Sequence, residues 1–145
     1  MAIRKATQQE LQEILGYSRE VFQESTMGLV EAAEIPEPLF SEGDGFYLVY
    51  SENNVIKGWI GMTSTWSPFG ETMVGVITEV YVLPDYRRSG IARQLCIKGM
   101  NALQEQGHHK VQLNVFAGND AKQLYHKLGF HEVSILMERR IGADI

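Results

Sequence analysis

The 145-residue chain has one cysteine, four prolines and no apolar run near the roughly 20 residues needed to cross a bilayer. One cysteine excludes an intramolecular disulfide framework and favours a reducing, cytoplasmic setting. The first ten residues, MAIRKATQQE, lack the apolar stretch that is typical of a secretion signal. The sequence therefore predicts a cytoplasmic protein with no membrane partner, folded as a single domain over residues 1–145.

Basic residues are scarce in the first part of the chain. Residues 1–86 hold 13 acidic and 4 basic side chains, and residues 20–52 hold eight acids without a lysine or arginine. Residues 87–145 reverse the balance, with 9 basic and 5 acidic side chains. A net charge of −5 and a pI of about 5.3 argue against a nucleic-acid partner. The asymmetry would suit a cationic ligand on one side and a phosphorylated ligand on the other; alternatively, the acids only solvate the surface.

The hydrophobic periodicity predicts a mixed sheet with helices on its faces. Thr7 stands three residues before Glu10, the spacing of a capping box, and predicts a helix from about 8 to 24. Further helices are predicted at 26–40, from 91 to near 107, and after Asn119. Strands are predicted near the N-terminus and at 46–52, 55–65, 73–83, 110–116 and 131–141.

The stretch LPDYRRSGIAR, residues 83–93, joins a predicted strand to a predicted helix. Such a junction presents unpaired backbone N–H groups at the positive end of the helix dipole, which is an anion-binding geometry. Gly90 permits close approach of the backbone, and Arg87 and Arg88 add positive charge, so the stretch favours a ligand pyrophosphate. The alternative is an ordinary turn with solvated arginines, since Walker and dinucleotide signatures are both absent.

Two motifs carry a resemblance to a known family. VYVLPDYRRSGIA resembles the acetyl-CoA-binding motif of the GNAT superfamily of N-acetyltransferases, Arg/Gln-x-x-Gly-x-Gly/Ala, through Arg87, Gly90 and Ala92. NDAKQLYHKLGF resembles the second motif of the family, and together the motifs cover about residues 74–132. The resemblance implies an α/β (α+β) fold. Its mixed, mostly antiparallel central sheet would have six to seven strands, about four flanking helices and a splayed V-shaped gap. Residues 1–70 would form the acceptor-side half and residues 73–141 the acetyl-CoA-binding half.

The resemblance also assigns residues to the co-substrate. The backbone of Val80 and Val82 would pair with the pantetheine arm of acetyl-CoA, and Asn119 would hydrogen-bond that arm. Arg87 belongs to the same motif. The pyrophosphate would be held by backbone N–H groups across Arg88, Ser89, Gly90, Ile91, Ala92 and Arg93. No metal is expected, because the histidines fall at no metal-ligand spacing and only one cysteine is present.

Acyl transfer from a thioester to an amine needs a base, an acid and a donor to the carbonyl oxygen. Glu79 lies in the apolar run VITEVYV, where a partly desolvated carboxylate is a candidate general base. The alternative is a solvated or lysine-paired side chain. Tyr125, in the second motif, is the candidate general acid for the leaving thiolate, or else a buried core aromatic. The N–H of Val82 would polarise the thioester carbonyl.

The sequence thus predicts an N-acetyltransferase that moves an acetyl group to a primary amine by direct transfer in a ternary complex. The acidic stretch, with Glu31 and Glu34, favours a small cationic amine or a basic peptide as the acceptor. The competing interpretation is a non-catalytic acyl-CoA-binding sensor or partner module. The predicted strand at 131–141 would lie at a sheet edge, which would permit a homodimer.

Overall fold

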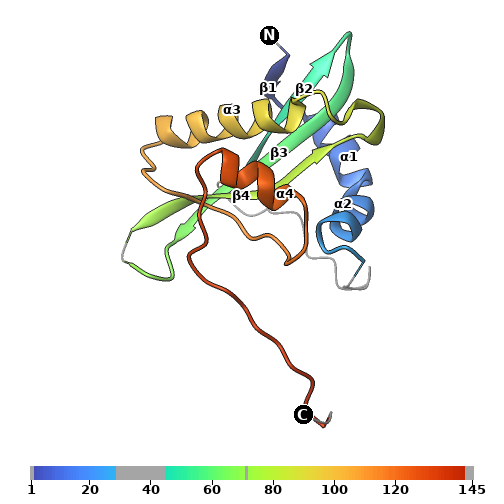
Figure 1. The fold of residues 1–145 in the computed structure, drawn as a ribbon. Helices are drawn as coiled ribbons and strands as arrows, with labels where there is room; N and C mark the ends of the chain where they lie inside the picture. Colours follow the sequence, from blue (N-terminus) through green and yellow to red (C-terminus); the bar gives the residue numbers. More distant parts are fainter. Residues whose placement is uncertain (1, 29–44, 71, 143–145) are drawn as a thin grey trace.

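The structure, a computed structural model, describes residues 2–28, 45–70 and 72–142. Within these ranges, five strands form one sheet in the order β1-β2-β3-β4-β5 (Figure 1). The strands span Ile3–Lys5, Phe46–Glu52, Val55–Trp66, Met73–Val82 and Val111–Gln112. The first three pairings are antiparallel and the last, between β4 and β5, is parallel. The described residues thus form the mixed α+β architecture that the sequence predicts.

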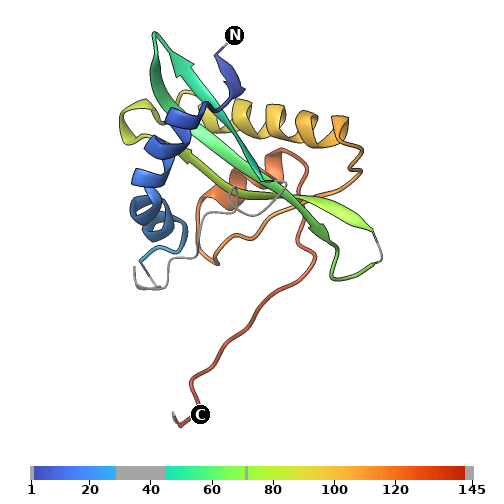
Figure 2. The same ribbon diagram turned by 180° about the vertical axis from the view of Figure 1, so that it is seen from behind.

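Four α-helices of the described residues cover the two faces of the sheet. Helices α1 (Gln8–Gly16) and α2 (Ser18–Ser25) lie on one face, and α3 (Ile91–Glu105) and α4 (Ala121–Lys127) lie on the other (Figures 1 and 2). The first core contains Ile14, Val21, Tyr47, Val49, Trp59 and Tyr81. The second contains Ile60, Met62, Ile77, Val82, Ile91, Leu95, Cys96 and Leu103. Each such aliphatic side chain stabilises the fold by roughly 1.5–3 kcal/mol when fully buried.

The N-terminal helical region begins as predicted but is divided. Thr7 accepts a hydrogen bond from the Glu10 N–H (3.2 Å), while the Glu10 carboxylate accepts one from the Thr7 N–H (2.9 Å), which confirms the capping box. The predicted single helix ends at Gly16 and restarts at Ser18. The Ser18 hydroxyl bonds the Leu15 carbonyl (2.8 Å), a local bond that competes with the helical pattern.

Strand β4 contains a bulge that matters for the site. Gly61 of β3 faces Glu79, but its neighbour Met62 faces Ile77, so Thr78 is an extra residue on β4. Gly61 has no room for a side chain, because a Cβ there would lie 2.7 Å from the Tyr47 ring and 2.8 Å from the Thr78 hydroxyl. The bulged Thr78 and the Tyr47 ring therefore occupy the space that a side chain at position 61 would need.

The predicted sheet of six to seven strands is corrected by the structure to five among the described residues. The predicted strand at 131–141 is wrong for this structure, because residues 131–140 form no strand and leave the body of the domain (Figure 1). Alternation identifies a chain able to form a strand, but a strand also needs a partner, and sequence spacing does not supply one. The predicted strand at 110–116 is shortened to Val111–Gln112.

The predicted helix at 26–40 falls largely on residues 29–44, which lie outside the described residues. Among the helices of the described ranges, none combines the length and the apolar composition that a membrane crossing requires.

Candidate active site

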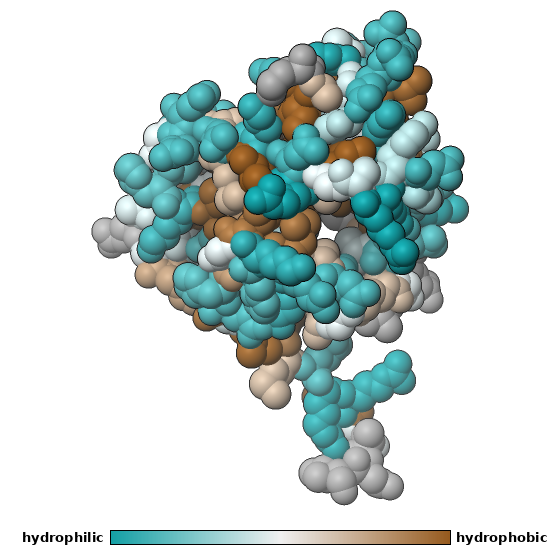
Figure 3. Space-filling view, turned by 45° about the horizontal axis from the view of Figure 1, so that its top comes forward, coloured by the Kyte–Doolittle hydropathy of each residue, from teal (hydrophilic) through white to brown (hydrophobic). Residues whose placement is uncertain are grey.

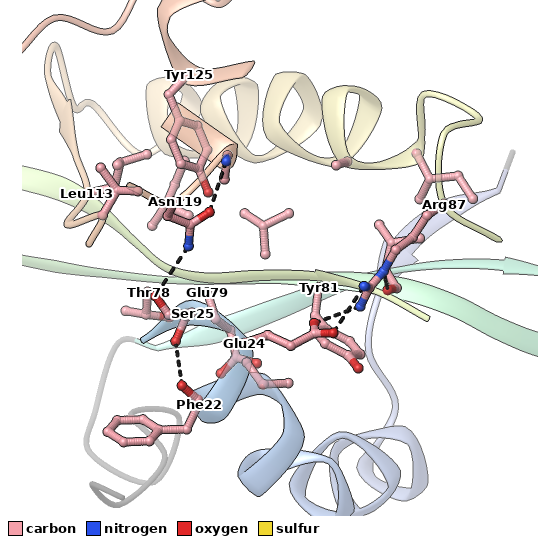
Figure 4. Close-up of a pocket in the computed structure, with 18 of the residues that line it drawn as sticks. Phe22, Glu24, Ser25, Thr78, Glu79, Tyr81, Arg87, Leu113, Asn119 and Tyr125 are labelled. Carbon is pink, nitrogen blue, oxygen red and sulfur yellow. Dashed lines mark hydrogen bonds and ion pairs between the residues drawn. The ribbon is translucent and has the colours of Figure 1, made fainter. Parts of the chain in front are cut away.

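A cleft of about 640 Å³ lies between β4 and residues 113–116, which continue the chain beyond β5. β4 and β5 pair at only two positions, Gly75 with Val111 and Val76 with Gln112. Beyond this short pairing, the walls come from the end of α2, the second half of β4, the start of α3 and α4 (Figure 4). The V-shaped splay of strands that the resemblance implies stays a prediction.

Glu79 projects from β4 into this cleft on the α1 and α2 side of the sheet. One carboxylate oxygen accepts a hydrogen bond from the Tyr47 hydroxyl and the other from the Trp59 indole N–H, each at 2.8 Å. Both donors are buried, so the carboxylate is held in a fixed orientation while each oxygen keeps a second lone pair. Burial, together with the neighbouring Glu79 charge, raises the pKa of Tyr47, which keeps this phenol a donor. Glu79 is half-buried, and no lysine of the described residues forms an ion pair with it.

Tyr125 reaches the same cleft from α4, on the opposite face of the sheet (Figure 4). Its ring packs edge-on against Phe130, with centroids 5.9 Å apart. Burial raises the pKa of Tyr125 to about 12, with a smaller contribution from Cys96, so the phenol stays protonated across the physiological range. Tyr125 is thus a core aromatic, as the alternative in the sequence analysis predicts, and it also places a protonated hydroxyl in the cleft.

The backbone of β4 also faces the cleft. The Leu83 N–H bonds the Lys57 carbonyl (2.9 Å) on the β3 side, and successive residues of a strand direct their backbone groups to opposite sides. The N–H and C=O groups of Val80 and Val82 therefore point away from β3, and both residues line the cleft. This orientation is the one that the predicted backbone contacts require.

The loop before α3 leaves backbone donors without side-chain caps. Gly90 is the N-cap of α3 with a left-handed φ of 83°, and no side chain caps the first turn. Arg88 also has a positive φ of 64°. A Cβ on Gly90 would meet only the Gln94 side chain at 4.0 Å, so the backbone conformation, and not space, calls for glycine. This 15-residue helix therefore begins with the unsatisfied N–H groups that bind anions.

The Arg87 side chain forms hydrogen bonds with protein groups in this structure. Its guanidinium donates to both carboxylate oxygens of Glu24 on α2, at 3.0 and 2.7 Å, and its Nε donates to the Val82 carbonyl at 2.7 Å. The guanidinium also lies 5.2 Å from the centre of the Tyr81 ring. Arg87 thus ties α2 to the end of β4 across the mouth of the cleft (Figure 4); its contact with a pyrophosphate stays a prediction.

Asn119 joins α2 to α4 on the other side of the cleft. Its side-chain oxygen accepts from the Ala121 N–H (2.9 Å), in the manner of a helix cap, and its amide donates to the Ser25 carbonyl (3.2 Å). The predicted start of a helix after Asn119 is confirmed. The predicted bond to a pantetheine arm is not tested by these contacts.

One predicted acceptor contact lies beyond what the structure describes. Glu31 and Glu34 fall in residues 29–44, outside the described ranges. Within the described ranges, no group of three or more histidine, cysteine, aspartate or glutamate side chains could hold a metal ion.

Sequence reasoning missed the residues that support Glu79 and Arg87. Tyr47 and Trp59 look like ordinary core aromatics in the sequence, although each also carries a donor that must find a partner when buried. Glu24 belongs to the acidic stretch but is not distinguished there from its neighbours. The glycines of the strand at 55–66 were the available signal, since glycine inside a strand often marks a bulge or a close approach.

Residues 7–130 match the acetyltransferase (GNAT) family. Among curated proteins, the chain is 33% identical over 90 residues to a mycothiol acetyltransferase from Paenarthrobacter aurescens. That match covers 60% of this chain and only 27% of the relative, so the chain spans about a quarter of the length of the relative that it matches.

Solved structures share the architecture at low identity. A putative acetyl transferase from Pyrococcus furiosus superposes with a TM-score of 0.83 at 22% identity, covering 96% of this chain and 98% of the other. An aminoglycoside N-acetyltransferase in complex with CoA gives a TM-score of 0.73 at 16% identity, covering 97% and 94%. At these identities the likeness shows the fold alone.

Proposed function

Because the chain belongs to the acetyltransferase (GNAT) family, we propose that it transfers an acetyl group from acetyl-CoA to a primary amine, by direct transfer in a ternary complex. The observation that carries the proposal is a single cleft lined from opposite faces of the sheet by a fixed carboxylate, Glu79, and a protonated phenol, Tyr125. Acyl transfer to an amine needs a base on the acceptor side and an acid on the thiol side.

The residues around the cleft fit acetyl-CoA. The uncapped first turn of α3, with Gly90 in a left-handed conformation, is suited to the pyrophosphate. The outward backbone N–H and C=O of Val80 offer a donor and an acceptor to the amides of the pantetheine arm, while the Val82 carbonyl beside them already accepts a hydrogen bond from Arg87. Arg87 and Asn119, which here bond Glu24 and Ser25, both line the same cleft. Acetyl-CoA supplies the activated thioester, and no metal is needed for such chemistry.

Three groups of the chain carry the proposed chemistry, two by moving a proton and one by donating a hydrogen bond. Glu79 accepts the proton that the amine loses, directly or through a water molecule. The Val82 N–H donates to the carbonyl oxygen as negative charge develops on it, as an oxyanion-hole donor does. Tyr125 gives its proton to the sulfur as the carbon–sulfur bond breaks, and recovers a proton from solvent. No covalent intermediate on the enzyme is required, since Cys96 is buried and burial raises its thiol pKa to about 11.

We infer a cationic acceptor from the charge of the acceptor side. Burial raises the pKa of Tyr81, in the wall of the cleft; the charges of Glu24 and Glu20 raise it further, and Arg87, which pairs with Glu24, opposes them. Glu31 and Glu34 continue the acidic stretch along the chain. One solved neighbour is named as an aminoglycoside N-acetyltransferase, which is in keeping with a small cationic amine. A basic peptide N-terminus is the second acceptor of this class.

The test is a thiol-release assay with acetyl-CoA and a panel of amines of graded charge. We expect turnover on polyamine or aminoglycoside acceptors and little on anionic amino acids. Replacing Glu31 and Glu34 by glutamine should then raise KM for dications more than for monocations, with kcat nearly unchanged. If KM for every amine were unaltered, the two glutamates would have no part in acceptor binding.

The rival from another class is a module that binds acyl-CoA without turnover. Calorimetry with acetyl-CoA separates the two: binding without acetylation of any amine on successively broader panels would favour the sensor. Absence of both binding and turnover would overturn both readings.

A further inference from the structure

The last turn of α2 is hydrogen-bonded to loops on two sides of the cleft. The Glu24 carboxylate accepts two bonds from the Arg87 guanidinium, which lies between β4 and α3, at 3.0 and 2.7 Å. The carbonyl of the next residue, Ser25, accepts a bond from the Asn119 amide, before α4, at 3.2 Å (Figure 4). The proposed function assigns Arg87 and Asn119 to acetyl-CoA. The end of α2 therefore bonds the polar groups of two residues that the co-substrate would also use.

The Arg87 guanidinium divides its donors between two partners. Its two terminal nitrogens, Nη1 and Nη2, donate to Glu24, whereas its Nε donates to the Val82 carbonyl at 2.7 Å. The terminal nitrogens form the planar fork that binds a phosphate as readily as a carboxylate. Two phosphate oxygens can therefore replace the carboxylate while Nε keeps the side chain bonded to the end of β4.

The ion pair between Arg87 and Glu24 is accessible and weak enough to exchange. The two side chains are 38% and 48% exposed, and a pair with this exposure contributes little to stability because water screens it. Residues 131–142 stand clear of the body of the molecule (Figure 3), and they hydrogen-bond neither partner of the pair. A pyrophosphate at the start of α3 would offer the guanidinium more negative charge than one carboxylate does.

On the basis of the proposed function, we propose that Glu24 is a specificity residue that changes partner. The pyrophosphate of acetyl-CoA takes the Arg87 fork, and the released carboxylate binds the second ammonium group of a dicationic acceptor. Glu24 and Glu79 line the same cleft, from α2 and from β4, so one amine can reach the base while the other pairs with Glu24. Bound CoA therefore raises the affinity for such an acceptor, and by linkage the acceptor raises the affinity for CoA by the same factor.

A double-mutant cycle on CoA binding tests the exchange. Calorimetry with CoA would compare the full-length wild type, Glu24→Gln, Arg87→Gln and the double variant. Glu24→Gln frees the fork, so it should tighten CoA binding about threefold to tenfold. In the Arg87→Gln background it should change the affinity by less than about 1.5-fold, because competition needs both partners, whereas a through-space effect of the lost charge would persist. Glu13→Gln, on the exposed side of α1 and outside the cleft, is the matched control and should leave CoA binding within about 1.5-fold of wild type.

Titration with spermidine tests the acceptor side of the exchange. Saturating CoA should tighten spermidine binding to the wild type about fivefold or more, and the gain should disappear in Glu24→Gln. Pantetheine, which lacks the pyrophosphate, should give no gain. Butylamine, which carries one charge, should gain less from CoA than spermidine does.

The outcomes separate this proposal from the proposed function. If CoA failed to bind the wild type, the proposed function itself would be refuted. If CoA bound but Glu24→Gln left its affinity unchanged, or if the effect persisted in the Arg87→Gln background, the exchange would be overturned and the pair would be a fixed tie between α2 and β4. Equal spermidine affinities with and without CoA would overturn the acceptor role of Glu24. The Glu24 side chain is half-exposed, so its replacement leaves the core intact.

Discussion

Replacing Tyr125 by phenylalanine removes one hydroxyl from the cleft and leaves the aromatic packing in place. The ring still meets Phe130 edge-on at 5.9 Å, and no described residue hydrogen-bonds the hydroxyl. We therefore expect the free energy of unfolding to change by less than about 1 kcal/mol. General acid catalysis contributes about 10²–10⁴ in rate, which corresponds to about 3–5 kcal/mol of the barrier. The expected result is a kcat lower by that factor in a protein of unchanged stability.

The pH dependence sharpens this prediction. A general acid works below its pKa, and burial raises the pKa of Tyr125 to about 12 from the ordinary value of 10. The wild-type kcat should therefore show no alkaline decline from this group up to about pH 10, whereas an ordinary phenol would begin to lose its proton there. A decline centred at or below pH 10 that vanishes in the phenylalanine variant would contradict the burial argument.

The assay is thiol release at saturating acetyl-CoA and amine, with the dissociation constant of CoA measured by calorimetry. Tyr86→Phe is the matched control, because Tyr86 lines the same cleft from the loop before α3 and takes no part in the proposed proton transfer. The control should keep kcat within about threefold of wild type. If Tyr125→Phe also stayed within about fivefold, Tyr125 would not be the acid, and a water molecule would have to protonate the thiolate.

Three further predictions concern stability and the alignment of the site. Glu10→Gln should lower the free energy of unfolding by about 1 kcal/mol at pH 7. Arg4 lowers the Glu10 pKa to about 2, but solvent screens the partly exposed pair. In urea melts, this pH-dependent stability should be present above about pH 4.5 and lost as the pH falls through about 2. Gly99→Ala should lower the free energy of unfolding by about 1–3 kcal/mol, because its Cβ would lie 2.8 Å from a buried methionine sulfur. Gly16→Ala, which has open space around it, is the control and should not lower the melting temperature of the protein. Gly61→Ala should lower kcat more than it raises KM for CoA, because it displaces the tyrosine ring that holds the carboxylate in the cleft; equal changes in both would argue for general damage.

Local signals in the sequence predicted most of the elements well. The capping box at Thr7 and Glu10 and the β-branched run at 73–83 each involve neighbours within a few residues, and the structure has the corresponding helix start and strand. The helix predicted after Asn119 is present, and Gly90, which was expected to permit close approach of the backbone, is the left-handed N-cap of α3. These features depend on backbone geometry that a short stretch specifies by itself.

Long-range partners were beyond the sequence. Arg87 and Glu24 are 63 positions apart, and nothing in either neighbourhood indicates that they bond. The strand predicted at 131–141 was wrong for a related reason. The alternation of the segment is correct for a strand, but the described part of the chain gives it no partner strand. A pattern indicates which structure a segment can form, whereas strand pairing depends on whether the rest of the structure offers a free strand edge.

The bulge in β4 explains why the orientation of Glu79 could not be predicted from alternation. A strict period of two places Ile77, Glu79 and Tyr81 on one face. In the structure Ile77 belongs to the α3-side core, while Glu79 and Tyr81 face α1 and α2, because Thr78 adds one residue between them. One inserted residue thus lets a single strand bury apolar side chains under α3 and, two positions later, direct a carboxylate to the face that α1 and α2 cover. Deleting Thr78 should restore a regular ladder in which Ile77 still faces Met62 and Glu79 still faces Gly61, so the carboxylate keeps its side of the sheet. Glu79→Gln should abolish turnover with or without that deletion, and retained activity in the glutamine variant would show that Glu79 is not the base.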